Sequence, residues 1–223
     1  MLDRIGSAQP PNFNLPDEPH GVLADLPLPV YMTTNYDDFM VRGLSSRGKQ
    51  PKRELFRWNS DLTKNYTSIF DTRADYQPTP AEPVVFHLHG HNEVPESLVL
   101  TEDDYLDFLV NLSSDRYRLP HWIERALTGS TLLFIGYSLA DWNFRVLFRG
   151  LVRVREQSLR YGNFMVQVLP LPAEAPEEER QRVQRYLDKY FDEEKVRVYW
   201  GTATEFCQEL RERATAEGVH RGS

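Results

Sequence analysis

The chain has 223 residues, of which 40% are hydrophobic and 26% charged, a composition that suits one sizeable globular domain with a buried core. Its net charge of −7 excludes a global basic field, so we expect no nucleic-acid partner. One cysteine, Cys207, excludes a disulfide framework and a four-cysteine zinc ribbon, and the absence of a signal pattern or a long apolar run predicts a cytoplasmic protein without a membrane partner.

The first third of the chain alternates between polar and apolar segments. Residues 1–27 are rich in Pro, Asn and Asp, which predicts a loop or disordered N-terminal segment. The apolar, β-branched run 28–34 predicts a strand, and 38–44 a short helix. Residues 45–82 mix aromatic, Pro and basic residues, so we predict an irregular insertion with one strand near 55–58.

Strands and helices alternate regularly in the rest of the chain. Such alternation predicts an α/β fold, namely a Rossmann-like parallel sheet with helices on both faces, within one domain over residues 28–217 and followed by a disordered tail over 218–223. Strands are predicted over 83–89, 131–135, 164–169 and 196–200, and helices over 101–112, 121–127, 138–156 and 176–191 and after the capping pattern that begins at Thr202.

Three polar clusters follow predicted strands. They are 33–37 (Thr-Thr-Asn-Tyr-Asp), 87–91 (His-Leu-His-Gly-His) and 136–139 (Gly-Tyr-Ser-Leu). Ligands of open parallel sheets bind at the carboxyl ends of the strands, so we expect the three clusters to form one site. The alternative is purely local: the first cluster can be a strand stop with a helix cap, and the third a tight turn with an N-cap.

The histidines allow two interpretations. His87, His89 and His91 alternate, so on one strand they would share a face as zinc ligands do. Gly90 interrupts the strand, however, and no carboxylate or cysteine completes a coordination shell. We therefore expect no metal, with one histidine packed as structure and another available for acid–base chemistry.

The clusters carry a family resemblance. Cluster 33–37 resembles the Thr-Gln-Asn-Ile-Asp motif of the sirtuins, His89-Gly90 is similar to their catalytic His-Gly, and 136–139 resembles their Gly-Thr-Ser-Leu. The three occur in the sirtuin order. The segments 134–143 and 199–206 are similar to the bacterial Sir2-like branch found in phage-defence systems, and the resemblance covers residues 25–215.

This resemblance implies an NAD-cleaving site. Asn35 would position the ribose and an attacking water, Asp37 would hold the carboxamide of nicotinamide, and His89 would be the general base. Neutral polar groups and a carboxylate suit the positive charge that builds on the sugar. NAD is then a substrate, and the residues expected to bind it are Thr33, Thr34, Gly90, Gly136, Tyr137, Ser138 and Asp141.

Two departures from the sirtuin pattern affect the functional prediction. The zinc ribbon is absent, which disfavours the NAD-dependent protein deacylase activity that would need a groove built from 45–82. No Gly-rich strand and loop of the kind that cradles phosphates is found before Leu28, so we expect weak NAD binding by this chain alone.

We predict an NAD⁺ glycohydrolase of bacterial anti-phage defence that acts as a homo-oligomer or with a defence-system partner. The alternative is a non-catalytic module that binds NAD or ADP-ribose or serves assembly. The aromatic-rich helix expected over 142–154 is interpreted as a sheet-covering element, and an oligomer interface is the second interpretation.

Overall fold

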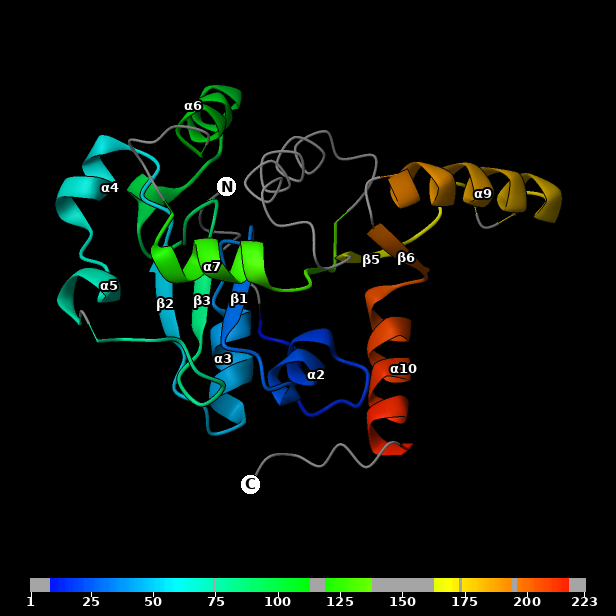
Figure 1. Cartoon of the computed structure of the whole chain (residues 1–223), viewed down its shortest axis with the longest axis horizontal. Coiled ribbons are helices and arrows are strands. Elements are labelled where there is room, and N and C mark those ends of the chain that lie inside the picture. Colours follow the sequence, from blue (N-terminus) through cyan, green and yellow to red (C-terminus); the bar gives the residue numbers. More distant parts are fainter. Residues whose placement is uncertain are drawn as a thin grey trace. The chain divides into compact units, whose positions relative to one another are not determined.

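The computed structural model describes residues 9–73, 75–112, 119–137, 163–172, 174–193 and 196–216. The chain divides into two compact units. Unit 1 comprises Met1–Glu124 with Val219–Ser223, and unit 2 comprises Arg125–Gly218. Both units are shown in Figure 1, and each is described by itself below.

The core of unit 1 is a parallel sheet of three strands. Its order is β1 (Val30–Thr33), β3 (Val84–His87) and β2 (Lys52–Leu55), so the strand that comes last in the sequence lies in the centre (Figure 1). In this register Thr33 and Leu55 are both partners of His87. The carboxyl ends of the three strands therefore meet at one edge.

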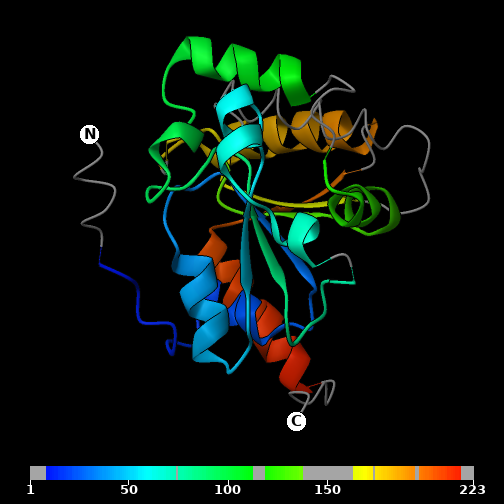
Figure 2. The same ribbon diagram turned by 90° about the vertical axis from the view of Figure 1, so that its left-hand side faces the viewer.

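Helices cover both faces of this sheet (Figure 2). On one face, α2 (Pro19–Asp25) and α3 (Phe39–Ser46) pack on the strands, with Ala24, Tyr31, Leu44 and Val85 in a common cluster. Neighbouring strand residues point to opposite faces, so Phe86 lies on the other side. There Phe56 contacts Phe86 and Phe108, and Phe108 belongs to α6 (Glu102–Leu112).

The segment 45–82, predicted as irregular, is ordered. It contains β2, α4 (Ser60–Asn65) and α5 (Ile69–Thr72), and β2 begins three residues before the strand predicted near 55–58. Three of the four residues of β2 are charged, so the sequence lacks the apolar pattern that predicts a buried strand. Its buried Glu54 accepts the backbone N–H of Ile69 at 2.6 Å, a tertiary contact that no local pattern indicates.

The N-terminal segment also differs from the prediction, because it contains α2. Glu18 caps this helix by accepting the N–H groups of His20 and Gly21, although glutamate is not among the usual capping residues. Arg47 then ties the segment to α3, with Nε 2.7 Å from Asp25 Oδ1 and Nη2 2.8 Å from the Phe13 carbonyl oxygen.

Unit 2 contains a second parallel sheet, ordered β4 (Leu133–Phe134), β5 (Asn163–Gln167) and β6 (Val196–Trp200). The helix α9 (Glu177–Glu193) places Phe191 against Phe134, Met165 and Val196. The last helix is α10 (Ala203–Ala216).

Two predicted capping patterns are present. Thr101 and Asp104 exchange reciprocal hydrogen bonds of 2.9 and 3.1 Å at the start of α6, and Thr202 and Glu205 do so with 2.7 and 3.1 Å before α10. The helix predicted over 121–127 is α7 (His121–Gly129). The helix predicted over 138–156, with its aromatic stretch 142–154, lies outside the described residues.

The α/β, Rossmann-like fold class predicted from the sequence is confirmed, since both described sheets are parallel and helices flank them. That 28–217 form one domain stays a prediction. Among the described helices, none combines the length and the apolar character that crossing a membrane requires.

Candidate functional site

The loop after β1 holds Asn35 by its backbone and leaves its side chain exposed. The Asn35 N–H donates to Thr33 Oγ1 at 3.0 Å, and its carbonyl oxygen lies 3.1 Å from Nδ1 of His87. Within the described part of the chain, the Asn35 amide group makes no hydrogen bond. An exposed polar side chain on a fixed backbone at a strand end is typical of a ligand contact.

The loops after β1 and β3 are joined to each other. The Leu88 N–H donates to the Thr33 carbonyl at 2.8 Å, and the Asn92 N–H donates to the Tyr36 carbonyl at 2.9 Å. The Tyr36 hydroxyl donates to the Val99 carbonyl at 2.6 Å. Burial, with a smaller effect of Asp104, raises the pKa of Tyr36, so this hydroxyl keeps its proton. The first two predicted clusters therefore form one rim.

The loop after β3 is closed around Ser97, which belongs to the short helix η1 (Pro95–Ser97). Ser97 Oγ accepts the His91 N–H at 2.9 Å and donates to the Val94 carbonyl at 2.6 Å. Gly90 has φ +89°, and a Cβ there would overlap the Ser97 carbonyl group. Glycine is thus required by the packing of the loop itself.

The three histidines have different surroundings. His87 and His91 are fully buried, with ring centroids 5.0 Å apart. Burial lowers the pKa of each to about 4, and the Arg53 guanidinium also opposes protonation of both. Arg53 Nη1 lies 3.1 Å from His91 Nε2, and the Glu93 N–H donates to His91 Nδ1 at 3.1 Å. Both rings are therefore neutral at physiological pH.

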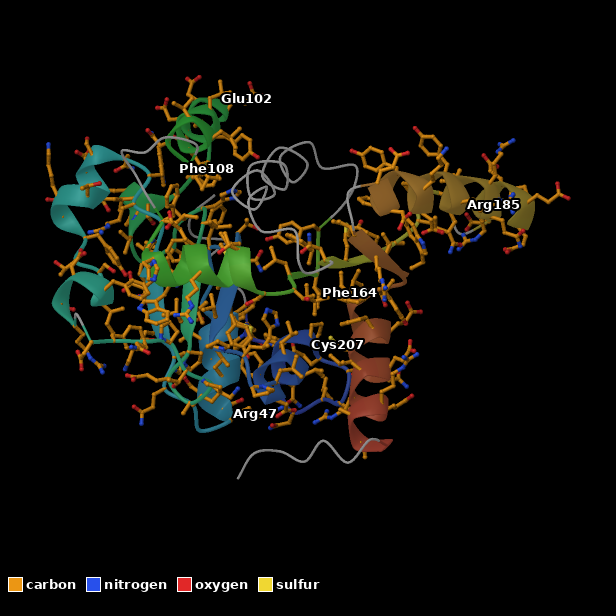
Figure 3. All side chains as sticks on the ribbon, in the orientation of Figure 1. Arg47, Glu102, Phe108, Phe164, Arg185 and Cys207 are labelled. Carbon is orange, nitrogen blue, oxygen red and sulfur yellow. The ribbon has the colours of Figure 1, made fainter. Side chains whose placement is uncertain are left out.

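His89, the predicted base, is only partly buried. Its ring meets Phe108 edge-on at 4.9 Å and Tyr105 at 5.8 Å, both from α6. Phe108 lies on the side of α6 that faces the sheet (Figure 3). The Nε2 atom of His89 has no contact with solvent. These aromatic contacts fix the plane of the ring beside the Asn35 rim.

The described residues contain no group of three or more His, Cys, Asp or Glu side chains that could hold a metal ion. His87 and His91 lie together, but an arginine lies against the second ring. A cation in that place would have to displace a guanidinium. The absence of a metal stays an expectation.

Asp37 has a local role. Its Oδ1 accepts the Phe39 N–H at 3.0 Å, at the start of α3. The residue is partly exposed, and no hydrogen bond of its second oxygen to a described residue is found. Asp37 therefore bonds the first residue of α3, although the N-cap residue is Asp38, whose side chain makes no cap hydrogen bond. A contact between Asp37 and substrate stays a prediction.

The remaining predicted NAD contacts are divided between unit 2 and the end of β1 with the loop after it in unit 1, and two of them lie outside the described residues. Gly136 has φ +81°, and no described atom lies within 4 Å of the Cβ it lacks. The Tyr137 carbonyl accepts from Nε2 of the buried Gln167 at 2.9 Å. Ser138 and Asp141 lie outside the described residues, and Thr34 and Thr33 lie in the rim of unit 1.

Sequence reasoning missed three residues that build the rim. The hydrogen bond from His87 to the Asn35 carbonyl and the one from Tyr36 to Val99 were not predicted, and Trp58 was placed within the strand predicted near 55–58 and not after it. Trp58 follows β2 and is buried, and its Nε1–H donates to the Ser97 carbonyl at 2.9 Å. The only local signal was the position of each residue beside a strand end.

Comparison with known proteins shows the family of the chain. Residues 29–198 match the family described as SIR2-like domain. A protein named NAD(+) hydrolase ThsA from Acinetobacter baumannii (strain 532279) is 29% identical over 150 residues, which are 64% of this chain and 25% of that protein. Its namesake from Enterococcus faecium is 32% identical over 127 residues, 56% of this chain and 23% of that protein.

A further relative is Defense-associated sirtuin 2 from Bacillus subtilis, 26% identical over 146 residues, which are 64% of this chain and 12% of that protein. The chain thus spans a quarter or less of the length of these curated relatives.

Proposed function

The chain belongs to the SIR2-like domain family, and from this premise we propose that it is an NAD⁺ glycohydrolase domain of antiviral defence. Its relatives are named NAD(+) hydrolase and defence-associated sirtuin, which supports both parts of the proposal. The reaction would be hydrolysis of the bond between nicotinamide and ribose, with NAD⁺ as substrate.

The position and bonding of Asn35 support the proposal at the level of a specific residue. Asn35 is exposed at the edge where three parallel strands end, its backbone is held on both sides, and its side-chain amide makes no hydrogen bond to any described residue. A side chain that is held in place without structural bonds of its own is available to bind substrate.

The chemistry that this site would support balances without any further reagent. The C–N bond to nicotinamide breaks, and nicotinamide leaves with the bonding electrons, which neutralises its ring charge. Water adds to the ribose carbon and loses a proton, so the products are nicotinamide, ADP-ribose and a proton. The Asn35 amide would orient the ribose and the water, and the Asp37 carboxylate would hold the carboxamide and favour the developing positive charge.

His89 would take the proton. Its ring is neutral when it acts as a base, and the edge-on contacts with Phe108 and Tyr105 set its plane. Gly136, Tyr137, Ser138 and Asp141 would bind other parts of NAD, as their similarity to sirtuin motifs implies. Thr33, Thr34 and Gly90 would contribute backbone groups or hydroxyls.

A second candidate function is binding of NAD or ADP-ribose without turnover. It is favoured by the shielding of His89 Nε2 from solvent and by the hydrogen bond that one Asp37 oxygen already accepts from the Phe39 N–H. In that case the rim would bind the ligand, but no base would reach the water.

Release of free nicotinamide from NAD⁺ by the purified protein separates the two functions. We expect wild-type protein to form nicotinamide and ADP-ribose in equal amounts. Asn35→Ala should abolish this release while changing the free energy of unfolding by less than about 0.5 kcal/mol, because the side chain makes no structural bond. Binding of NAD without products by the wild type would favour the second candidate.

The matched control is Asn65→Ala. Asn65 is exposed at the end of α4, and within the described part of the chain its side chain makes no hydrogen bond. This variant should change the free energy of unfolding by less than about 0.5 kcal/mol and keep its activity per folded molecule. An active Asn35→Ala protein would overturn the catalytic assignment of Asn35.

A further inference from the structure

His87 contacts the backbone of the residue on which the proposed function rests. Its ring ends the central strand β3, is fully buried, and places Nδ1 3.1 Å from the Asn35 carbonyl oxygen. A carbonyl oxygen only accepts hydrogen bonds, so Nδ1 must carry the proton. The contact joins two strand ends that are 52 positions apart in the sequence.

The other ring nitrogen has no such role. With Nδ1 protonated, Nε2 of neutral His87 is an acceptor, and it is buried without a hydrogen-bond partner among the described residues. Burial lowers the pKa of His87 to about 4, and the neighbouring His91 and Arg53 act in the same direction. The ring is therefore neutral and confined to one tautomer.

We propose that neutral His87 is a positioning residue that orients Asn35 for cleavage of NAD⁺, an inference that rests on the proposed function. Because the exposed Asn35 amide has no side-chain partner, its direction depends on the backbone alone. That backbone is held by the Thr33 hydroxyl at the N–H and by His87 at the carbonyl. Loss of the His87 donor would release the peptide between Asn35 and Tyr36 to rotate.

The unpartnered Nε2 argues against a purely structural role. An unsatisfied buried acceptor destabilises the folded state, and an apolar side chain of similar size would avoid this. Histidine at this position is thus explained by what its other nitrogen does, namely donate to Asn35. Val85, two residues earlier on the same face of β3, is equally buried and apolar, so packing on this face does not require a histidine.

Two substitutions separate the donor from the packing. Asparagine carries its amide nitrogen on Cγ, as histidine carries Nδ1, so His87→Asn keeps a donor near the same place. His87→Leu fills the space without a donor. The control is His121→Leu, the same chemical change at an exposed position at the start of α7.

The kinetic readout is nicotinamide release per folded molecule. For His87→Leu we expect kcat to fall about 10- to 100-fold with KM nearly unchanged, since a displacement of about 1 Å in a reacting group can cost on the order of 100-fold. His87→Asn should recover most of kcat, and His121→Leu should match the wild type. Equal loss of kcat in both His87 variants would overturn the proposal.

A spectroscopic readout does not depend on activity. ¹⁵N NMR of the wild-type protein should show His87 as the neutral tautomer protonated on Nδ1 at neutral pH. The order parameter of the Asn35 side-chain amide should fall in His87→Leu and recover in His87→Asn. A proton on Nε2, or an unchanged Asn35 amide in His87→Leu, would contradict the positioning role, whereas absence of nicotinamide release by the wild type would contradict only the proposed function.

Discussion

At the scale of single residues, Asp37 combines a structural bond with a proposed contact to substrate. Its Oδ1 accepts the Phe39 N–H, and asparagine could accept the same bond without the charge. The two roles can therefore be separated by changing charge and hydrogen-bonding capacity independently.

We predict that Asp37→Asn keeps the stability of the wild type and loses at least about tenfold in kcat/KM, because a charge-assisted contact to substrate is weakened. Asp37→Ala should lose the same activity and, in addition, about 1 kcal/mol of stability through the missing hydrogen bond to the Phe39 N–H. Urea unfolding and nicotinamide release measure the two effects. Full activity of Asp37→Asn would leave Asp37 only its structural bond to Phe39.

The buried histidines predict a dependence of stability on pH. The pKa of His87 and of His91 is lowered from 6.5 to about 4, so the unfolded chain binds more protons than the folded one in that interval. Stability is therefore full above pH 6.5 and falls as the pH drops toward 4, by at most about 1.4 kcal/mol per pH unit for each histidine. Burial raises the pKa of Glu54 above its ordinary 4.5, so this carboxyl acts in the opposite direction, in a pH interval that overlaps that of the histidines.

Urea unfolding across this pH interval tests the assignment. His91→Leu should flatten the slope, since one of the two titrating rings is removed. His121→Leu, which changes an exposed ring, should leave the slope as it is. If stability depends on pH as steeply in His91→Leu as in His121→Leu, groups other than His91 cause the dependence.

At the scale of structural elements, two glycines with positive φ differ in their surroundings. Gly90 at φ +89° packs against the Ser97 carbonyl, whereas Gly48 at φ +75° has open space where a Cβ would stand. The pair separates the cost of the backbone conformation from the cost of steric overlap.

We predict that Gly48→Ala costs about 1–2 kcal/mol of stability, the price of the left-handed conformation alone. Gly90→Ala should cost about 3 kcal/mol or more and lower activity, because the loop after β3 must move. Thermal unfolding with an activity assay measures both. Equal losses of stability in Gly48→Ala and Gly90→Ala would mean that the loop around Ser97 shifts to accommodate the added Cβ without a further loss of stability.

The sequence predicted those elements whose causes are local. The capping boxes of α6 and α10 are formed by residues three apart, and the apolar runs of β1 and β3 are continuous, so both are visible in a short window. The strand β2 was misplaced because its charges are satisfied at a distance, with Arg53 against His91 and Glu54 against Ile69.

The candidate site follows the same distinction. Asn35, Asp37 and His89 were predicted from their positions at strand ends and from family resemblance, and their roles stay predictions. The support by His87 could not be predicted, because its partner lies 52 positions away. The structural role of Tyr36 was not predicted for the same reason, because its hydroxyl donates to the carbonyl of Val99, which is distant in the sequence.

At the scale of the whole molecule, charge shapes the encounter with substrate. The chain carries a net charge of −7, and NAD⁺ is itself an anion at neutral pH. Repulsion between the two is screened by salt, whose Debye length falls from about 30 Å at 0.01 M to about 8 Å at 0.15 M.

We therefore predict that KM for NAD⁺ stays constant or falls modestly, by less than about twofold, as ionic strength rises through this range. Initial rates of nicotinamide release at several salt concentrations, with a neutral salt, give the measurement. A KM that climbs steeply with salt would instead indicate a strong local field of positive charge at the site.

The central position of β3 has a consequence for the order in which the chain is made. β1 and β2 pair only with β3 in the described sheet, and β3 leaves the ribosome after both. Until Val84–His87 have been synthesised, Asn35 lacks the ring that holds its carbonyl, and both earlier strands lack their neighbour. Long-range parallel pairing of this kind is also slow to form. The backbone support of Asn35 in the proposed site therefore cannot form on a growing chain until β3 has been synthesised.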